Sequence, residues 1–218
     1  MVAAAVGRAV RLSRSWLLLC ALHGVGSMLL WWADPVTLHA LTWRVDEGLQ
    51  RPWTWWTSAW ADPATPTLIS HQLALGVLAA VAWRWRLPAA ATVAWCLAWP
   101  LAQATLVLWP QIGYAVGLSG VLHAAWAVLA VQLLLRRVAL LRARRWGALL
   151  LLALLLKLGL EQAWQHPVIW DRANDRSLVQ ALHLSGAFWG LLLGALAAHG
   201  PRRRARWPVR GTADGHPG

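Results

Sequence analysis

The sequence predicts an all-α integral membrane protein of six transmembrane helices. Of its 218 residues, 59% are hydrophobic and only 13% are charged, a composition too apolar for the surface of a soluble domain. The apolar residues form six long runs, and a bilayer core of about 30 Å needs roughly 20 helical residues to cross it. Many of the 19 Trp residues lie near the ends of these runs, where an amphipathic ring suits the membrane–water interface.

Each apolar run comes within a few residues of the length that a spanning helix requires. The first run follows Arg8, Arg11 and Arg14, as a secretory signal would, but residues 27–32 offer no small-residue cleavage site. We therefore expect an uncleaved first helix. In chain order the predicted spans are 15–32, 67–85, 89–109, 115–135, 146–164 and 178–199.

The distribution of Arg predicts the orientation, because positive residues close to the spans are retained on the cytoplasmic side. Both termini are expected in the cytoplasm, and the loops after the first, third and fifth helices outside. The predicted external face has only Arg44, Arg51, Arg172 and Arg176. The predicted cytoplasmic face holds Arg8, Arg11, Arg14, Arg84, Arg86, Arg136, Arg137, Arg142, Arg144, Arg145, Arg202, Arg203, Arg204, Arg206 and Arg210.

These features predict a cytoplasmic N-terminus at residues 1–14, a six-helix membrane domain at 15–199 and a basic cytoplasmic tail at 200–218. The long external segment 33–66 mixes Trp with acidic residues, so we expect it to lie in the outer membrane interface. The sequence shows no internal repeat and no second domain. The tail is rich in Arg and Pro, which is typical of a disordered segment.

Charge and cysteine content narrow the functional classes. The net charge of +12 does not predict nucleic-acid binding, because the Arg residues fall in short clusters between apolar runs and form no continuous basic face. Cys20 and Cys96 both lie inside apolar runs, which supports neither a disulfide framework nor a zinc knuckle. We expect membrane lipid as a partner, and neither a metal nor a cofactor.

Three polar residues inside the predicted spans suggest a function, since polar groups are costly in a membrane and mark functional sites there. Ser119 lies within the first turns of the fourth predicted helix, counted from its external end. His183 lies about one turn into the sixth helix and His71 about one turn into the second, from the same side. All three are therefore expected at a similar depth, in the outer third of the bilayer.

A serine hydroxyl becomes a nucleophile when a neutral imidazole within hydrogen-bond reach takes its proton, and Ser119 and His183 can form this pair across two helices. Gly117 and Gly120 flank the serine, and small residues allow helices to approach closely. For the oxyanion of a tetrahedral intermediate, the candidate donors are the Ser119 backbone N–H and the His71 side chain. A stripe of small residues follows the histidine and comprises Gly186, Gly190 and Gly194.

The residues around this pair resemble those of the rhomboid intramembrane serine proteases, and the resemblance covers all six helices in order. The segment Trp53 to Thr57 is similar to the Trp-Arg-x-x-Thr element ahead of the second rhomboid helix. Three further features are similar to the rhombosortase branch: the Gly-x-Ser-Gly-x-Leu-His form, Lys157 followed by Glu161-Gln162, and a His-Leu-x-Gly-Ala run. The motifs are Gly117-Leu118-Ser119-Gly120 with Val121-Leu122-His123, and Ala181-Leu182-His183-Leu184-Ser185-Gly186-Ala187.

This resemblance implies a six-helix rhomboid-like bundle in which Ser119 is the nucleophile and His183 the general base, with no acidic third member. His71, with Gly117 and Gly120, would form the oxyanion and substrate-binding site. The substrates would be transmembrane segments of other proteins, among them exported proteins with a C-terminal Gly-Gly-containing helix and a basic end. The resemblance also implies a Gram-negative inner membrane, with the active site toward the periplasm.

The sequence departs from the rhomboid pattern at two positions. Leu75 stands where many rhomboids have an Asn four residues after the His of the second helix, so one oxyanion donor is missing. Gln72 and Gln103 are candidate replacements. Thr54 stands where the first element usually has Arg.

Other polar residues inside the spans are expected to stabilise the bundle. His123 lies one turn from Ser119 on the same helix, and we expect it to hydrogen-bond a neighbouring helix. Lys157 and Glu161 are four residues apart and can pair on one helix face, which offsets the cost of burying each charge. His23 lies mid-span, where a packed neutral histidine is expected.

Two other functions remain open on the sequence alone. Paired His residues on facing helices could ligate haem in a membrane electron carrier, although His23 lies nearer mid-span than His71 and His183. The other is a rhomboid-like protein that binds transmembrane helices without cleaving them. Loss of the Ser or the His would mark such a protein, and both residues are present.

Overall fold

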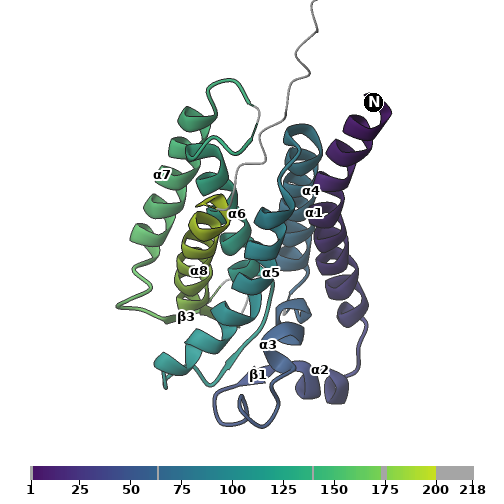
Figure 1. Cartoon of the computed structure of the whole chain (residues 1–218). Coiled ribbons are helices and arrows are strands. Elements are labelled where there is room, and N and C mark those ends of the chain that lie inside the picture. Colours follow the sequence, from purple (N-terminus) through teal and green to yellow (C-terminus); the bar gives the residue numbers. More distant parts are fainter. Residues whose placement is uncertain (1, 63, 139, 173–175, 200–218) are drawn as a thin grey trace, which may run out of the picture.

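The protein is mostly helical. The computed structural model describes residues 2–62, 64–138, 140–172 and 176–199, and these form eight α-helices, two short 3-10 helices and two antiparallel sheets (Figure 1). The long helices are α1 (Val2–Trp31), α4 (Thr65–Trp85), α5 (Ala89–Ala104), α6 (Ser119–Leu134), α7 (Ala143–Glu161) and α8 (Gln180–His199). The shorter elements are α2 (Pro35–Leu41), β1 (Trp43–Arg44), α3 (Thr54–Thr57), η1 (Ser58–Trp60), η2 (Thr105–Leu108), β2 (Tyr114–Ala115), β3 (Val168–Asp171) and β4 (Arg176–Val179).

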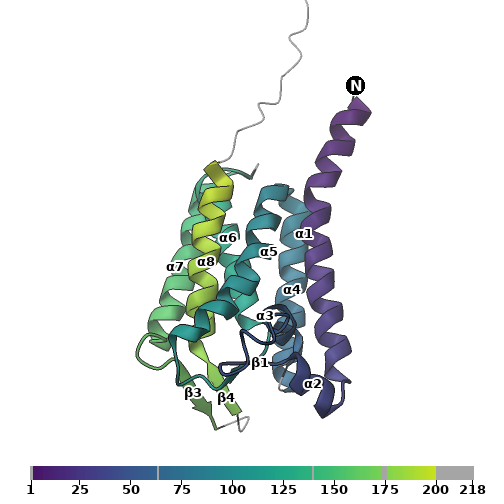
Figure 2. The same cartoon turned by 60° about the horizontal axis from the view of Figure 1, so that its bottom comes forward.

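Each predicted span overlaps one long helix, and the six helices pack side by side in alternating directions (Figures 1 and 2). Among the described residues, three helices are long and apolar enough to cross a membrane: α4, α5 continued by η2 to Leu108, and α8. The first helix starts earlier than predicted, at Val2, because residues 2–14 are mostly good helix formers. The predicted tail, 200–218, lies outside the described residues.

Two predicted helix boundaries near the site are wrong. Ala115 does not begin the fourth helix; together with Tyr114 it forms β2, which pairs with β1. Gly117 has φ 98°, a conformation that glycine adopts readily and that a right-handed helix excludes, so α6 begins only at Ser119. At the other boundary, Gln162 has the left-handed φ of 49° and ends α7 at Glu161.

The central helix of the bundle is α6, whose side chains are mostly buried against its neighbours. It packs most closely against α8. A Cβ atom built on Gly120 would lie 2.8 Å from the carbonyl oxygen of Leu182, and one on Gly190 would lie 2.8 Å from Cα of Ala124. The predicted close crossing of these two helices is therefore confirmed, and it depends on glycine.

Arg side chains are concentrated at one end of the bundle, with only a few at the end that holds the acidic side chains of the described residues. The α4–α5 and α6–α7 connections lie at the end where α1 begins and α8 stops (Figure 1). The opposite end carries α2, α3 and both sheets (Figure 2). This distribution is what the predicted orientation requires. The basic end exposes Arg84, Arg86, Arg142, Arg144 and Arg145, and the opposite end has Asp34, Asp46, Glu47, Asp62, Glu161 and Asp171.

Much of the segment predicted to lie in the membrane interface is folded onto the helix ends. Trp43 is fully buried, and its β1 backbone pairs with Ala115 of β2. The hydroxyl of Thr57 donates a 2.7 Å hydrogen bond to the carbonyl of Leu41, which closes the loop. Trp53 and Trp56 remain exposed, as an interfacial surface requires, and the position of this segment in a membrane stays a prediction.

Candidate active site

Ser119 lies at the first position of α6, where the chain leaves the Gly117 turn. The Gly117 N–H donates a 3.0 Å hydrogen bond to the carbonyl of Ser58, so the external segment holds this turn in place. The Ser119 backbone N–H belongs to the first turn of α6, whose N–H groups have no acceptor within the helix and lie at the positive end of its dipole. It therefore remains a candidate oxyanion donor.

Two cavities meet at Ser119. One, of about 290 Å³, lies at the end of the bundle that carries the sheets, and its lining includes Gly117 together with residues of β2 and β4. The other, of about 530 Å³, lies between α4, α6 and α7. Both cavities are lined by Ser70, His71, Ser119 and His183. The structure thus brings together the serine and the two histidines singled out in the sequence, from three separate helices.

His183 contacts a carboxylate on the neighbouring helix. Its Nδ1 lies 2.9 Å from each of the two carboxylate oxygens of Glu161. Since a carboxylate accepts, Nδ1–H is the donor, which leaves the lone pair of a neutral imidazole on Nε2. Among the described residues no hydrogen bond joins the Ser119 hydroxyl to His183, although both line the same cavities, and such contacts often shorten only when substrate binds.

Lys157 and Glu161 pair on one face of α7, as predicted. The resemblance implied no acidic partner for His183, and sequence reasoning placed Glu161 only in this helical pair. The carboxylate in fact contacts both Lys157 and His183. The four-residue spacing along α7 predicted the contact with Lys157. No local sequence pattern could predict the contact with His183, which lies on another helix.

The hydrogen bond predicted from His123 to a neighbouring helix is not found; the ring bonds within its own helix instead. Its Nδ1–H donates to the Ser119 carbonyl oxygen at 2.6 Å. The His123 ring also stacks on that of His183, with centroids 4.3 Å apart and planes 13° apart. His123 therefore supports the position of His183 by packing.

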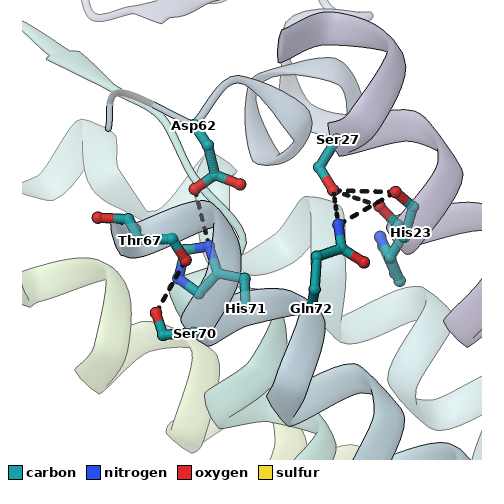
Figure 3. Close-up of polar contacts among 8 residues, drawn as sticks. His23, Ser27, Asp62, Thr67, Ser70, His71 and Gln72 are labelled. Carbon is teal, nitrogen blue, oxygen red and sulfur yellow. Dashed lines mark hydrogen bonds and ion pairs between the residues drawn. The ribbon is translucent and has the colours of Figure 1, made fainter. Parts of the chain in front are cut away.

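His71 is held by a carboxylate that the sequence analysis missed. Its Nδ1 lies 2.7 Å from Oδ1 of Asp62, whose side chain is fully buried (Figure 3). A Cβ atom built on Gly117 would lie 3.7 Å from both this oxygen and the His71 Cε1 atom. Asp62 precedes α4 and is nine residues from His71, a separation at which the sequence carries no signal of contact.

The two candidate replacements for the missing Asn do not lie at the site. Gln72 points to the opposite side of α4 from His71 (Figure 3), where its amide donates to the Ser27 hydroxyl at 2.8 Å and to the Gly24 carbonyl at 3.2 Å. Gln103 is buried in α5 and lines neither cavity. His23, in contrast, is buried and packed as predicted. Its neighbours are Trp rings, and the Trp60 indole N–H donates to its Nδ1 at 3.2 Å.

One group of side chains has the composition of a metal site. Ligand atoms of His123, Glu161 and His183 lie within 4.8 Å of one another. The two His rings are stacked almost parallel, so their in-plane nitrogen lone pairs run side by side instead of converging on one ion, and the same stacking leaves no room for a haem plane between them. Lys157 also pairs with Glu161. This geometry fits hydrogen bonding better than ligation.

Replacing Asp62 by Asn is expected to slow the reaction of Ser119 with a fluorophosphonate probe by about 10- to 100-fold, the range seen for partners that orient histidines at metal sites. Asn keeps the size of the side chain but loses its charge and can turn an N–H group toward His71. The rate would be measured on the purified protein in detergent. Asp34→Asn, at the exposed N-cap of α2, is the matched control, and equal rates for both variants would contradict a role for Asp62.

Comparisons of the chain with protein-family models, with curated proteins and with solved structures found no match. The function is therefore inferred from the sequence motifs and from the geometry of the site.

Proposed function

We propose that the protein is a rhomboid-type intramembrane serine endopeptidase that cleaves transmembrane segments of other proteins. The observation that carries this proposal is the meeting of the two cavities at Ser119, His183 and His71. A nucleophile, a base and an oxyanion donor are the groups that acyl transfer requires. The Glu161 contact, which leaves the His183 Nε2 able to accept a proton, adds support.

The reaction follows from these positions. Ser119 Oγ attacks the scissile carbonyl carbon while His183 Nε2 takes the hydroxyl proton. The Ser119 backbone N–H donates to the oxyanion, and so does Nε2–H of a His71 ring that carries both protons, because Nδ1–H is held by Asp62. The intermediate collapses by breaking the C–N bond, and His183 gives its proton to the departing amine. Water, deprotonated by His183, then attacks the acyl-serine and releases the second product.

The cavity between the helices offers the substrate a path from lipid. Its walls are largely apolar, and it ends at Ser119 and His183. A regular helix hides its carbonyls in backbone hydrogen bonds, so the substrate segment must unwind locally before attack, and helices weakened by Gly or Pro are the preferred substrates. By the rhombosortase resemblance, these include C-terminal Gly-Gly-containing helices with a basic end. The apolar lining comprises Ala74, Leu122, Trp126, Leu150, Ala153 and Leu154.

The proposed membrane arrangement has all six long helices spanning the bilayer. The Arg-rich end faces the cytoplasm with both termini, and the end with the cavity and the sheets faces the periplasm of a bacterial inner membrane. Support comes from the three long apolar helices and from the concentration of exposed Arg residues at one end. The central α6 is short but buried among other helices, so it needs less contact with lipid.

Fluorophosphonate labelling tests this function. The detergent-purified parent protein is expected to react with the probe at Ser119, as located by mass spectrometry, and Ser119→Ala is expected not to react. Ser70→Ala is the matched control, because Ser70 lines the same cavities while its hydroxyl donates to the Thr67 carbonyl of its own helix at 2.8 Å. Ser70→Ala should label like the parent.

A folded parent that does not react, or reacts at a serine other than Ser119, would contradict the catalytic proposal. A non-catalytic protein that binds helices in the same cavity would then be the better interpretation. Cleavage of a Gly-Gly-containing transmembrane segment by the parent, and not by Ser119→Ala, would identify the substrate class.

A further inference from the structure

We propose that Glu161 is a positioning residue that completes a Ser119–His183–Glu161 arrangement, by orienting the imidazole and stabilising its protonated form. The inference rests on the proposed function. It departs from the pair without an acidic member that the resemblance implies.

The geometry of the contact supports this role. His183 Nδ1 is centred between the two Glu161 oxygens, at 2.9 Å from each, and the side chains of His183 and Glu161 are only 13% and 16% exposed. A hydrogen bond to a carboxylate is stronger than one between neutral groups, and low exposure protects it from competition with water. The imidazole plane is further fixed by stacking on His123.

The position of Glu161 in its own helix is unfavourable without such a partner. It is the last residue of α7, where the negative end of the helix dipole destabilises an anion. Lys157, one turn earlier, offsets this in part, but its side chain is 49% exposed, and an exposed ion pair contributes little. The more buried contact of the carboxylate is the one with His183.

In the reaction this contact does two things. Donation from Nδ1–H holds the proton on that nitrogen, so Nε2 is free to accept the proton of Ser119. When the ring then carries both protons, the nearby carboxylate balances its positive charge. Glu161 itself exchanges no proton, and no bond to it forms or breaks.

The charges around His183 are expected to influence how the labelling rate of Ser119 depends on pH. The titratable groups that face it are Glu161 and Lys157 on α7, His123 on α6 and, across the cavity, His71 on α4. Of these only Glu161 carries a negative charge, which balances the charge of a ring that holds both protons. A neutral side chain at 161 removes that charge, so we expect the pH dependence of the labelling rate to change.

The test compares labelling rates of Ser119 over a range of pH in the parent, Glu161→Gln and Lys157→Gln. In Glu161→Gln we expect the maximal rate to fall by about 10⁴-fold, as for loss of the acidic member in other serine hydrolases, and the pH profile of the rate to change. In Lys157→Gln we expect a change of no more than about fivefold, in line with an exposed ion pair. Glu47→Gln, which breaks an ion pair with Arg51 in the external segment, controls for loss of a carboxylate.

The outcomes separate the two proposals. If the parent labels at Ser119 but Glu161→Gln labels at the parental rate with an unchanged pH profile, the positioning role is wrong and the protease proposal stands. If Lys157→Gln and Glu161→Gln lose activity equally with the parental pH profile, Glu161 acts only as the helical partner of Lys157, and the inference is again wrong. If the folded parent does not label, the proposed function fails first.

Discussion

Replacing His183 by Ala is expected to reduce labelling of Ser119 to the background of Ser119→Ala, and to lower cleavage of a substrate helix by roughly 10⁴-fold or more. Without the His183 imidazole, Ser119 loses the base that accepts its hydroxyl proton, and an unactivated serine is a weak nucleophile. The measurement is the labelling rate of protein whose helix content and thermal unfolding match those of the parent. Folding needs this check because His183 also packs on His123.

Adding free imidazole to His183→Ala gives a stricter test of His183 as the base. The variant enlarges a cavity that is already about 290 Å³, so free imidazole should enter it and restore part of the labelling in His183→Ala but not in Ser119→Ala. His39→Ala, at an exposed position on α2, should label like the parent. Parental labelling in His183→Ala would instead assign the base to His71, the other histidine held by a carboxylate.

The second large effect is expected at the α6–α8 crossing. In Gly186→Ala, the new Cβ atom would lie 2.9 Å from the carbonyl carbon of Gly120 and closer still to its oxygen. The two backbones would have to separate, and overpacking of this kind costs about 1–3 kcal/mol of the free energy of unfolding. Because the residue touched is next to Ser119, we also expect labelling to fall. Thermal unfolding in detergent and the labelling rate would measure the two effects.

Matched glycines distinguish crowding from the general effect of placing Ala in a helix. Gly76 in α4 and Gly159 in α7 have no atom within 4 Å of a built Cβ. Ala at either position should leave stability unchanged or raise it by up to about 1 kcal/mol, since Ala has the higher helix propensity. If Gly186→Ala and Gly76→Ala were equally stable, the α6–α8 crossing would tolerate separation of the two backbones, and this prediction would be wrong.

Much of the fold could be predicted because its signals are local. Span length, Trp placement and Arg distribution depend on neighbouring residues, and all six predicted spans are helices. The boundaries at 115 and 164 were wrong because an apolar run continues past the point where Gly117 or Gln162 turns the backbone. The candidate replacement of the missing Asn by Gln72 was wrong. Gln72 is next to His71 in the sequence, but its side chain faces α1, which the sequence does not show.

Local sequence patterns predicted the number and order of the long helices, the concentration of Arg at one end of the bundle, and Ser119, His71 and His183 as candidate site residues. Each of these follows from residue type and spacing along one segment. The carboxylate partner of each histidine, Asp62 for His71 and Glu161 for His183, becomes known only from the folded arrangement. These contacts join separate elements, and their geometry depends on how closely glycine lets the helices pack and on where each helix ends.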